Sequence, residues 1–500
     1  MIMQGNVHPF EIQTGSGKLG KPFYVVSILC IVAIAAVLIS RLGVAGGFAL
    51  ILMPFVVAYF NFLFRFPIIG YYSAVALSFV LLGLGRYIDD LPIGLAMDGL
   101  LILTYIALIF NKFYDRVDWK PAKKDITLLA VIWFGYSLLE VLNPESRSFS
   151  AWMSGMRGIS FYMVLMIPLA LLFINTNHKL NLFLYLWGIF SIIVSLKGIM
   201  QNTIGVDPWE KAWLDAGAAE THILFGKLRI FSFLSDAGQF GANQAYSAVV
   251  ATIIALSVKS RRSKIFCIII AVLGFYGMLL SGTRGAISIP LAGFALYFFL
   301  KKNILVMISG VIILLSVFFF FKYTSIGQNI QEIRRMRSAF DPNDPSLQVR
   351  IENQKKLSVY LASRPMGGGI GHAGVKAKKF LPNAFLSQIA TDSWYVLIWA
   401  EQGIIGLCLH LFILFYILIK ASYRIMFRIR DPILKMKMAA LASGMFGIMV
   451  ASYGNAVLGT MPTGMLLYTS MAVMLNTDIL DKEAISKNQE EKSLHSENEY

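Results

Sequence analysis

Arginines at the ends of apolar segments are the residues of this sequence best suited to chemistry. Arg284 lies in MLLSGTRGAISIP, between the apolar stretches 265–280 and 286–300. Arg229 lies in GKLRIFSFLSDAGQFGANQAYS, just before the apolar stretch 243–258, and Arg350 begins a predicted helix. A guanidinium group stays charged and binds phosphate oxygens through two parallel hydrogen bonds. An arginine at membrane depth costs about 2.5–3.5 kcal/mol, so it usually faces a wet cavity or a partner. Two interpretations stay open: a site for a phosphate-bearing ligand, or arginines that reach the headgroups of anionic lipids.

Two carboxylates lie further along the chain, in TDSWYVLIWAEQGIIGL. Asp392 is near the start of this segment, and Glu401 follows about two and a half helical turns later, so the two need not share a helix face. Asp392 has two interpretations, a helix N-cap or a general base that accepts a proton. Glu401 lies inside an apolar run, where a carboxylate is a functional candidate by default, although an ion pair with an arginine would make it structural.

The composition places these residues in a membrane protein. The 500 residues are 57% hydrophobic and only 14% charged, and the mean hydropathy is +0.66. Apolar stretches of helical length recur along the chain, and the short alternating segments of a β-barrel are absent. We therefore predict an all-α, polytopic transmembrane helix bundle of about 12–14 spans. The candidate spans are residues 23–40, 43–64, 67–85, 92–110, 126–142, 158–174, 180–200, 243–258, 265–281, 285–300, 304–321, 391–419, 438–456 and 461–477.

The positive charge indicates how such a bundle is oriented. The net charge is +16, and Lys and Arg concentrate in the loops 111–125, 257–264 and 420–437 and in the pair Lys301–Lys302. With fourteen spans, these loops share one side, which the positive-inside rule makes cytoplasmic together with both termini. Loop charge accounts for this balance, so nucleic acid is not an expected partner. The three cysteines lie in apolar runs and predict neither a disulfide framework nor a metal site.

The domain organisation follows from these spans. It comprises a cytoplasmic N-terminal segment (1–22), N-terminal transmembrane helices (23–200), a periplasmic loop (201–242), further transmembrane helices (243–321), a large basic periplasmic loop (322–390), C-terminal transmembrane helices (391–477) and a disordered, acidic cytoplasmic tail (478–500). The large loop carries eleven Lys and Arg against four Asp and Glu. We expect it to be partly helical, with helices over 326–340 and 347–362 on either side of the breaker DPNDP.

Three other patterns have ordinary structural interpretations. Gly367–Gly369 with Gly371 lack both the lysine-serine pair and the preceding strand of a nucleotide loop, so we interpret them as a tight turn. His372 has no plausible metal-ligand partners nearby. The aspartates of RYIDDLP, Asp89 and Asp90, are interpreted as loop charge rather than as metal ligands.

Four segments together resemble a known family. SGTRGA, the arginine-started helix that ends in RPMGGGIG, and DSWYVLIWAEQGIIGL are similar, in order and spacing, to motifs of the O-antigen ligase and O-antigen polymerase superfamily. LRIFSFLSDAGQFGANQAY resembles the outer-loop arginine segment of that family. The resemblance extends over about Arg229–Leu407, and the N-terminal half is similar only in being a series of membrane helices.

The resemblance implies a GT-C-like glycosyltransferase of the bacterial inner membrane. Its donor would be an undecaprenyl-diphosphate-linked oligosaccharide at the outer leaflet, and it would need neither a metal nor a cofactor. Arg229, Arg284 and Arg350 would bind the donor diphosphate, where preorganised cations stabilise the negative charge that develops on the leaving group. Asp392, Arg284 and Glu401 are the catalytic candidates. The other expected partners are a glycan or lipid acceptor, membrane lipids and other polysaccharide assembly proteins.

The sequence departs from the ligase pattern at one position. The ligases resembled here carry a histidine followed by an asparagine where this chain has Asp392 and Ser393. An aspartate serves as a base if its surroundings raise its pKa. The missing histidine therefore favours a polymerase of the glycan over a ligase.

A transporter or flippase of a polar or anionic lipid-linked substrate is the alternative function. Transporters often show internal repeats and broken helices near the bilayer midplane. The two halves of this sequence show no convincing repeat, and its charges gather at the outer boundary rather than at mid-depth. Both observations favour the enzyme. A non-catalytic scaffold is a third class, for which the sequence offers no positive sign.

Overall fold

The computed structural model describes residues 26, 29–30, 32–33, 36–37, 40–41, 43–88, 93–113, 117–224, 226–329, 331–338 and 345–497. The N-terminal segment 1–22, most of the first predicted span, Asp89, Asp90, the first four residues of DPNDP and the last three residues of the tail lie outside the described residues. The chain divides into two units, Met1–Pro67 and Ile68–Tyr500, and each is considered by itself.

The described residues confirm the predicted all-α fold. The first unit contains α2 (Val44–Arg65). The second unit contains α3 (Ile68–Leu84), α4 (Ile93–Phe113), η2 (Lys120–Ala122), α5 (Asp125–Leu139), η3 (Glu140–Leu142), α6 (Phe149–Met156), η4 (Arg157–Phe161), α7 (Tyr162–Phe173), α8 (Asn177–Thr203), α9 (Pro208–Trp213), η5 (Leu214–Ala218), α10 (Ala219–His222), β1 (Ile223–Leu224), β2 (Lys227–Leu228), α11 (Ala237–Ala255), α12 (Arg261–Leu280), η6 (Arg284–Ile287), α13 (Ser288–Leu300), α14 (Ile304–Tyr323), α15 (Gln331–Arg337), α16 (Pro345–Leu361), η8 (Val375–Lys379), α17 (Phe385–Gln388), α18 (Trp394–Phe427), α19 (Pro432–Ala451), α20 (Thr463–Met474) and α21 (Thr477–Glu497).

The helices match the predicted spans from the second span onward. Within the described residues, eight helices are long and apolar enough to cross a membrane, and four shorter helices are also apolar. Helix α14 is the most apolar of the eight and has little of its surface covered by protein. Helix α11 differs, because almost all of its residues are buried inside the protein. These helices indicate a multi-pass membrane protein.

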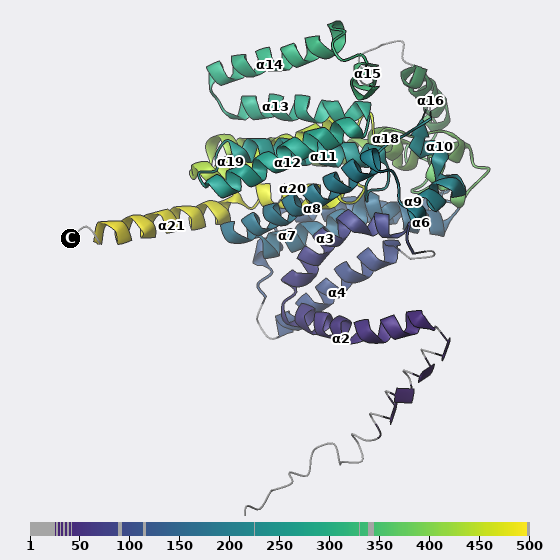
Figure 1. Ribbon diagram of the computed structural model, residues 1–500, viewed down its shortest axis with the longest axis horizontal. Helices are drawn as coiled ribbons and strands as arrows, with labels where there is room; N and C mark the ends of the chain where they lie inside the picture. Colours follow the sequence, from purple (N-terminus) through teal and green to yellow (C-terminus); the bar gives the residue numbers. More distant parts are fainter. Residues whose placement is uncertain are drawn as a thin grey trace, which may run out of the picture. The chain divides into compact units, whose positions relative to one another are not determined.

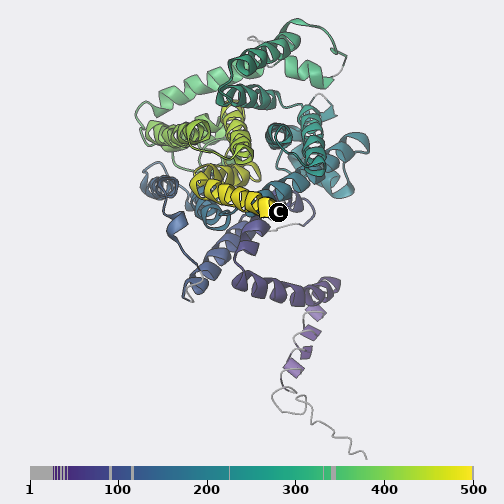
Figure 2. The same ribbon diagram turned by 90° about the vertical axis from the view of Figure 1, so that its left-hand side faces the viewer.

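Helix α11 lies at the centre of the second unit, against α8, α12, α13 and α19 (Figures 1 and 2). Close packing between α11 and α12 depends on small residues, since a Cβ atom on Gly274 would contact the backbone of Gln244. The Gln244 amide oxygen accepts hydrogen bonds from Ser191 and Ser195 of α8. The Gln244 side chain of α11 is therefore satisfied within the protein rather than exposed to lipid.

The two ends of the second unit are built differently. Figure 1 shows α9, α10, α15 and α16 at one end and α21 extending from the other. The two helices expected in the basic loop are present as α15 and α16, and α15 is shorter than expected. We call the end with α15 and α16 the arginine end and the opposite one the lysine end.

The C-terminal segment differs from the expected disorder, because Thr477–Glu497 forms α21. Lys487 pairs with Glu483 one turn earlier, at 2.9 Å. The Glu483 carboxylate also accepts hydrogen bonds from the backbone and side chain of Asn177 at the start of α8. Local ion pairing and docking on α8 stabilise a helix that composition alone does not predict.

Candidate functional site

Three arginines gather at the arginine end of the second unit. Arg229 follows the β1–β2 hairpin, and its Nη2 donates to Thr283 Oγ1 at 3.3 Å, next to Arg284. Arg284 begins the η6 turn and donates to Ser338 Oγ, at the end of α15, at 3.2 Å. Burial, together with the positive charges of Arg335 and Arg284, lowers the pKa of Arg229. Chain segments far apart in the sequence thus bring these cations together, as an anion-binding site requires.

Arg229 is half-buried and its hydrogen bonding is incomplete. Its Nε is buried and has no hydrogen-bond partner among the described residues. A buried guanidinium nitrogen without an acceptor is costly, because the group has lost water and gained nothing in return. The geometry around Arg229 therefore favours an incoming oxyanion.

The fourth arginine binds the candidate base directly. Arg350 of α16 pairs with Asp392 just before α18, with 3.2 Å between Nε and Oδ2. Both side chains remain accessible, and both line a small pocket with Tyr453 and Gly454. Asp392 does not cap α18, because the N-cap is Ser393, whose hydroxyl accepts from the backbone N–H of Val396. The capping interpretation of Asp392 is thereby excluded.

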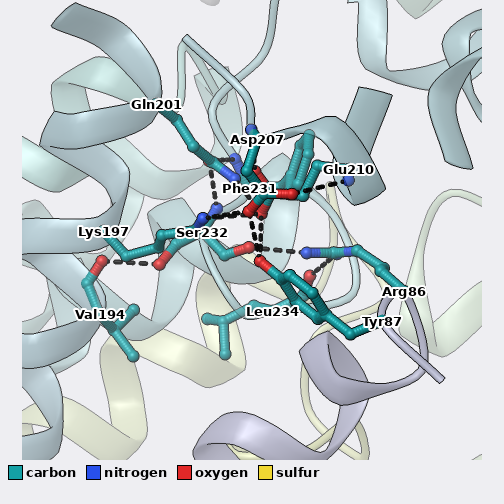
Figure 3. Close-up of polar contacts among 10 residues, drawn as sticks. All are labelled: Arg86, Tyr87, Val194, Lys197, Gln201, Asp207, Glu210, Phe231, Ser232 and Leu234. Atoms are coloured by element: carbon teal, nitrogen blue, oxygen red, sulfur yellow. Dashed lines mark hydrogen bonds and ion pairs between the residues drawn. The ribbon is translucent and has the colours of Figure 1, made fainter. Parts of the chain in front are cut away.

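A buried polar cluster positions the segment that carries Arg229 (Figure 3). Arg86, at the end of α3, donates to the carbonyl oxygens of Ser232 and Leu234. Its guanidinium lies 4.6 Å from the ring centroid of Trp213 and 4.3 Å from that of Phe231. Burial lowers the pKa of Arg86 to about 10, which leaves it charged at neutral pH. Arg86 therefore holds the chain that follows Arg229 in place.

Charged residues of α8 and α9 complete the cluster in Figure 3. Lys197 pairs with Asp207 at 2.9 Å and with Glu210 at 3.3 Å, and Tyr87 donates to Asp207 at 2.6 Å. Gln201 donates to Glu210 and accepts from the backbone N–H of Ser232 at 2.7 Å. These contacts join the end of α8 to the segment that carries Arg229.

Glu401 occupies a different environment from the arginines. It is buried in α18, and its carboxylate accepts from the backbone N–H of Ala373 at 3.3 Å. The backbone carbonyls of Ala400 and Glu401 accept from the N–H groups of Gly368 and Gly369, both at 2.9 Å. Glu401 therefore binds the glycine segment, residues 367–374, and the structure does not bring it together with Arg229 or Arg350.

The glycine segment is a packing device. Gly367, Gly369, Gly371 and Gly374 all have positive φ angles, between 78° and 92°. A Cβ atom on Gly371 would overlap the backbone of Ala151 in α6, so the chain approaches its neighbours closely. These contacts agree with the interpretation as a tight turn.

Two other polar residues near this end, His372 and Arg157, have structural partners. His372 Nε2 accepts from the backbone N–H groups of Arg147 and Ser148, and Nδ1 contacts the Ile370 carbonyl at 2.8 Å. Burial lowers the pKa of His372, which keeps the ring neutral. Arg157, another cation near this end, pairs with Asp98 of α4 at 2.6 Å.

Sequence reasoning missed Arg335. It was counted only as part of the basic loop, although a Cβ atom on Gly282 would lie 2.9 Å from its Nη1, beside Arg284. The available signal was the run EIRRMRS in a helical stretch, which puts several arginines on one short helix. The sequence does not show which of them faces the η6 turn. Sequence reasoning also missed three positioning residues, Arg86, Lys197 and Glu210, because the sequence does not show which distant residues they contact.

Comparison with known proteins adds a family to this geometry. Residues 245–411 match the family model described as O-antigen ligase. The matched stretch contains Arg284, Arg350, Asp392 and Glu401, whereas Arg229 precedes it. No curated protein matches the chain. The predicted resemblance to the O-antigen ligase superfamily is confirmed over the matched residues, and it supports a membrane enzyme that processes glycans for surface polysaccharides.

Proposed function

We propose that this membrane protein, with its O-antigen ligase domain, is an inner-membrane glycosyltransferase that polymerises an undecaprenyl-diphosphate-linked glycan at the outer leaflet. The observation that carries the proposal is the convergence of Arg229, Arg284 and Arg335 beside the Arg350–Asp392 pair. Guanidinium groups bind the oxygens of a diphosphate and stabilise the charge that it gains as a leaving group. The reaction proposed is metal-independent.

The Arg350–Asp392 pair suggests how substrate binding is coupled to catalysis. The donor diphosphate competes with Asp392 for the guanidinium of Arg350. Asp392, released from this ion pair, accepts the proton of the acceptor hydroxyl as that oxygen attacks the anomeric carbon. The bond between the anomeric carbon and the diphosphate oxygen breaks at the same time, and the lipid diphosphate departs with the bonding electrons.

The polymerase is favoured over the ligase because an aspartate stands where the ligases resembled here carry a histidine. Glu401 is assigned a positioning role in this proposal, since its carboxylate accepts a hydrogen bond from the glycine segment. In this proposal Arg284, the first residue of the η6 turn, binds the diphosphate directly.

Surface glycans separated on a gel test the function. Cells that lack the protein are rescued with the wild type, Arg284→Ala or Arg284→Lys, and membrane levels of each variant are measured. A polymerase predicts that the long-chain ladder collapses to single repeats without the protein and with Arg284→Ala. Arg284→Lys is also expected to lose most activity, since lysine lacks the bidentate fork.

Other outcomes distinguish the alternatives. Full-length polymer that stays on its lipid carrier identifies a ligase-type transferase. Unchanged glycans in every strain overturn the enzyme and favour a transporter, in which Arg284→Ala alters affinity while substrate movement continues. Full activity of Arg284→Lys contradicts diphosphate binding by this residue.

A further inference from the structure

A second cluster of polar residues lies at the lysine end, on the opposite side of the bundle from the arginines. A cavity of about 380 Å³ lies there between α8, α11, α12 and the start of α19. Its size lies within the roughly 300–1,000 Å³ of ligand sites, which are mostly apolar with a few placed polar groups. The cavity is lined by Asn181, Leu184, Tyr185, Trp187, Gly188, Ser247, Val250, Ala251, Ile254, Val258, Lys259, Ser260, Ser263, Phe266, Cys267, Ile270, Ile433 and Lys437.

Small residues of α8 and α11 form part of the cavity wall. Gly188 of α8 lets Phe266 and Ile270 of α12 pack directly against it, since a Cβ atom there would lie 2.5 Å from Ile270 and 2.8 Å from Phe266. Ala251 of α11 is also buried in the cavity wall. Tyr185, by contrast, is more than half exposed at the rim. The cavity thus has an apolar floor and an opening toward the surroundings of the bundle, which suits a hydrocarbon chain.

Lys437 supplies a buried charge to this cavity. Lys437 is only 9% exposed, and its ammonium group donates a hydrogen bond to the amide oxygen of Asn181 at 2.7 Å. Asp431 attracts it electrostatically, but among the described residues no carboxylate forms an ion pair with it. An ammonium group has three donors, and a buried charge is costly unless it is paired.

The residues around the mouth of the cavity are basic, which favours an anionic ligand. Lys259 lies at the mouth, and Arg261, Arg262 and Lys264 follow on the first turn of α12. None of the lining residues is acidic. Basic residues at the end of a membrane helix attract anionic lipids, at about 1 kcal/mol for each Lys or Arg near the surface. Hydroxyls of Ser260 and Ser263 add donors for phosphate oxygens.

We propose that this cavity is a binding site for an anionic glycerophospholipid, with an acyl chain along the apolar lining of α8, α11 and α12 and the phosphate on Lys437. The site does not depend on the proposed transferase activity. It is separate from the arginines, since the two lie at opposite ends of α12, which begins beside Lys259 and ends just before the η6 turn. The bound lipid wedges α8 against α12 and neutralises the charge of Lys437.

Native mass spectrometry of the purified, full-length protein tests the site. Dioleoyl phosphatidylglycerol and dioleoyl phosphatidylcholine are compared at equal concentration on the wild type and Lys437→Gln. We expect the wild type to retain phosphatidylglycerol preferentially and Lys437→Gln to lower its affinity about fivefold. Lys435→Gln is the matched control on the same helix, since Lys435 does not line the cavity, and it is expected to leave the affinity unchanged.

A photoreactive phosphatidylglycerol, with a diazirine in one acyl chain, places the bound lipid. We expect cross-links to Phe266, Cys267 or Ile270, and this measurement on the wild type does not require that a variant folds. Equal retention of both lipids, equal loss in the two lysine variants, or cross-links confined to other helices would overturn the proposal. Displacement of phosphatidylglycerol by an equal amount of undecaprenyl phosphate would also overturn it, because the occupant would then be the carrier lipid.

Discussion

Two neighbouring residues divide two roles at the start of α18. Ser393 caps the helix, whereas Asp392 is left available to pair with Arg350. From the sequence, the two roles were interchangeable, because serine and aspartate are both good N-caps. The structure assigns capping to Ser393 and the ion pair to Asp392. Variants at these two adjacent positions therefore test helix stability and catalysis separately.

Asp392→Asn is expected to reduce glycan polymerisation by about 10²–10⁴-fold, since an amide cannot act as the general base. Ser393→Ala is the control, expected to lower the free energy of unfolding by about 1 kcal/mol through loss of the cap while most activity remains. The measurement is the polymer formed in membranes from a purified lipid-linked repeat, normalised to protein level. Wild-type turnover by Asp392→Asn would remove this residue from the chemistry.

At the scale of elements, α18 and the glycine segment depend on each other. Helix α18 is broken at Gly403, where φ is 64° and ψ is −166°. A Cβ atom there would overlap the carbonyl oxygen of Pro365. The backbone carbonyls freed by the break accept from the N–H groups of Gly368 and Gly369. Irregular backbone within a membrane helix is tolerated because another part of the protein satisfies it.

Gly403→Ala is therefore expected to prevent stable insertion or to leave a protein that aggregates on extraction. Gly99→Ala is the matched control, because a Cβ atom on Gly99 meets nothing within 4 Å. Alanine is favoured over glycine within a helix by up to about 1 kcal/mol, so this control should be as stable as the wild type or slightly more. Fluorescence-detected size-exclusion profiles in detergent compare the two variants. A monodisperse Gly403→Ala protein would contradict the required close approach.

The cluster of Figure 3 predicts a pH dependence of stability. Burial acts against ionisation of Asp207, but hydrogen bonds from the Glu210 N–H, Tyr87 and Lys197 outweigh it and lower the pKa to about 2. A carboxyl whose folded-state pKa lies below its ordinary value of 3.8 stabilises the fold above that pH. This contribution, about 2 kcal/mol, is lost as the pH falls from about 4 through 2.

Asp207→Asn should lower the unfolding temperature at neutral pH and flatten its dependence between pH 4 and pH 2. The wild type and variant are compared by thermal unfolding in detergent, with Glu352→Gln as a control in an exposed ion pair. Parallel curves for wild type and Asp207→Asn across this pH range would show that ionisation of Asp207 does not contribute to the stability of the fold.

At the scale of the whole molecule, hydropathy predicted the positions of the helices in the sequence. It did not predict which helices pack together and so bring the arginines to one place. Each span from 43–64 onward has its helix, because length and apolarity are local properties of the chain. Arg229 and Arg284 meet only because α11 and α12 pack against each other and return the chain to one end. That contact depends on Gly274 and on the Arg86 cluster, whose side chains are distant in sequence. The hydrophobic periodicity of the sequence does not predict such long-range contacts.

The last prediction concerns orientation. The positive-inside rule puts the lysine end in the cytoplasm and therefore the arginine end outside. In a background with Cys30, Cys267 and Cys408 replaced by serine, single cysteines are introduced as Lys378→Cys in the basic loop and Arg428→Cys after α18, both exposed positions. A membrane-impermeant maleimide on intact spheroplasts should label only Lys378→Cys, and permeabilised cells should label both. The reverse pattern would place the arginines in the cytoplasm, where an outer-leaflet donor cannot reach them, and would refute the proposed polymerase together with its topology.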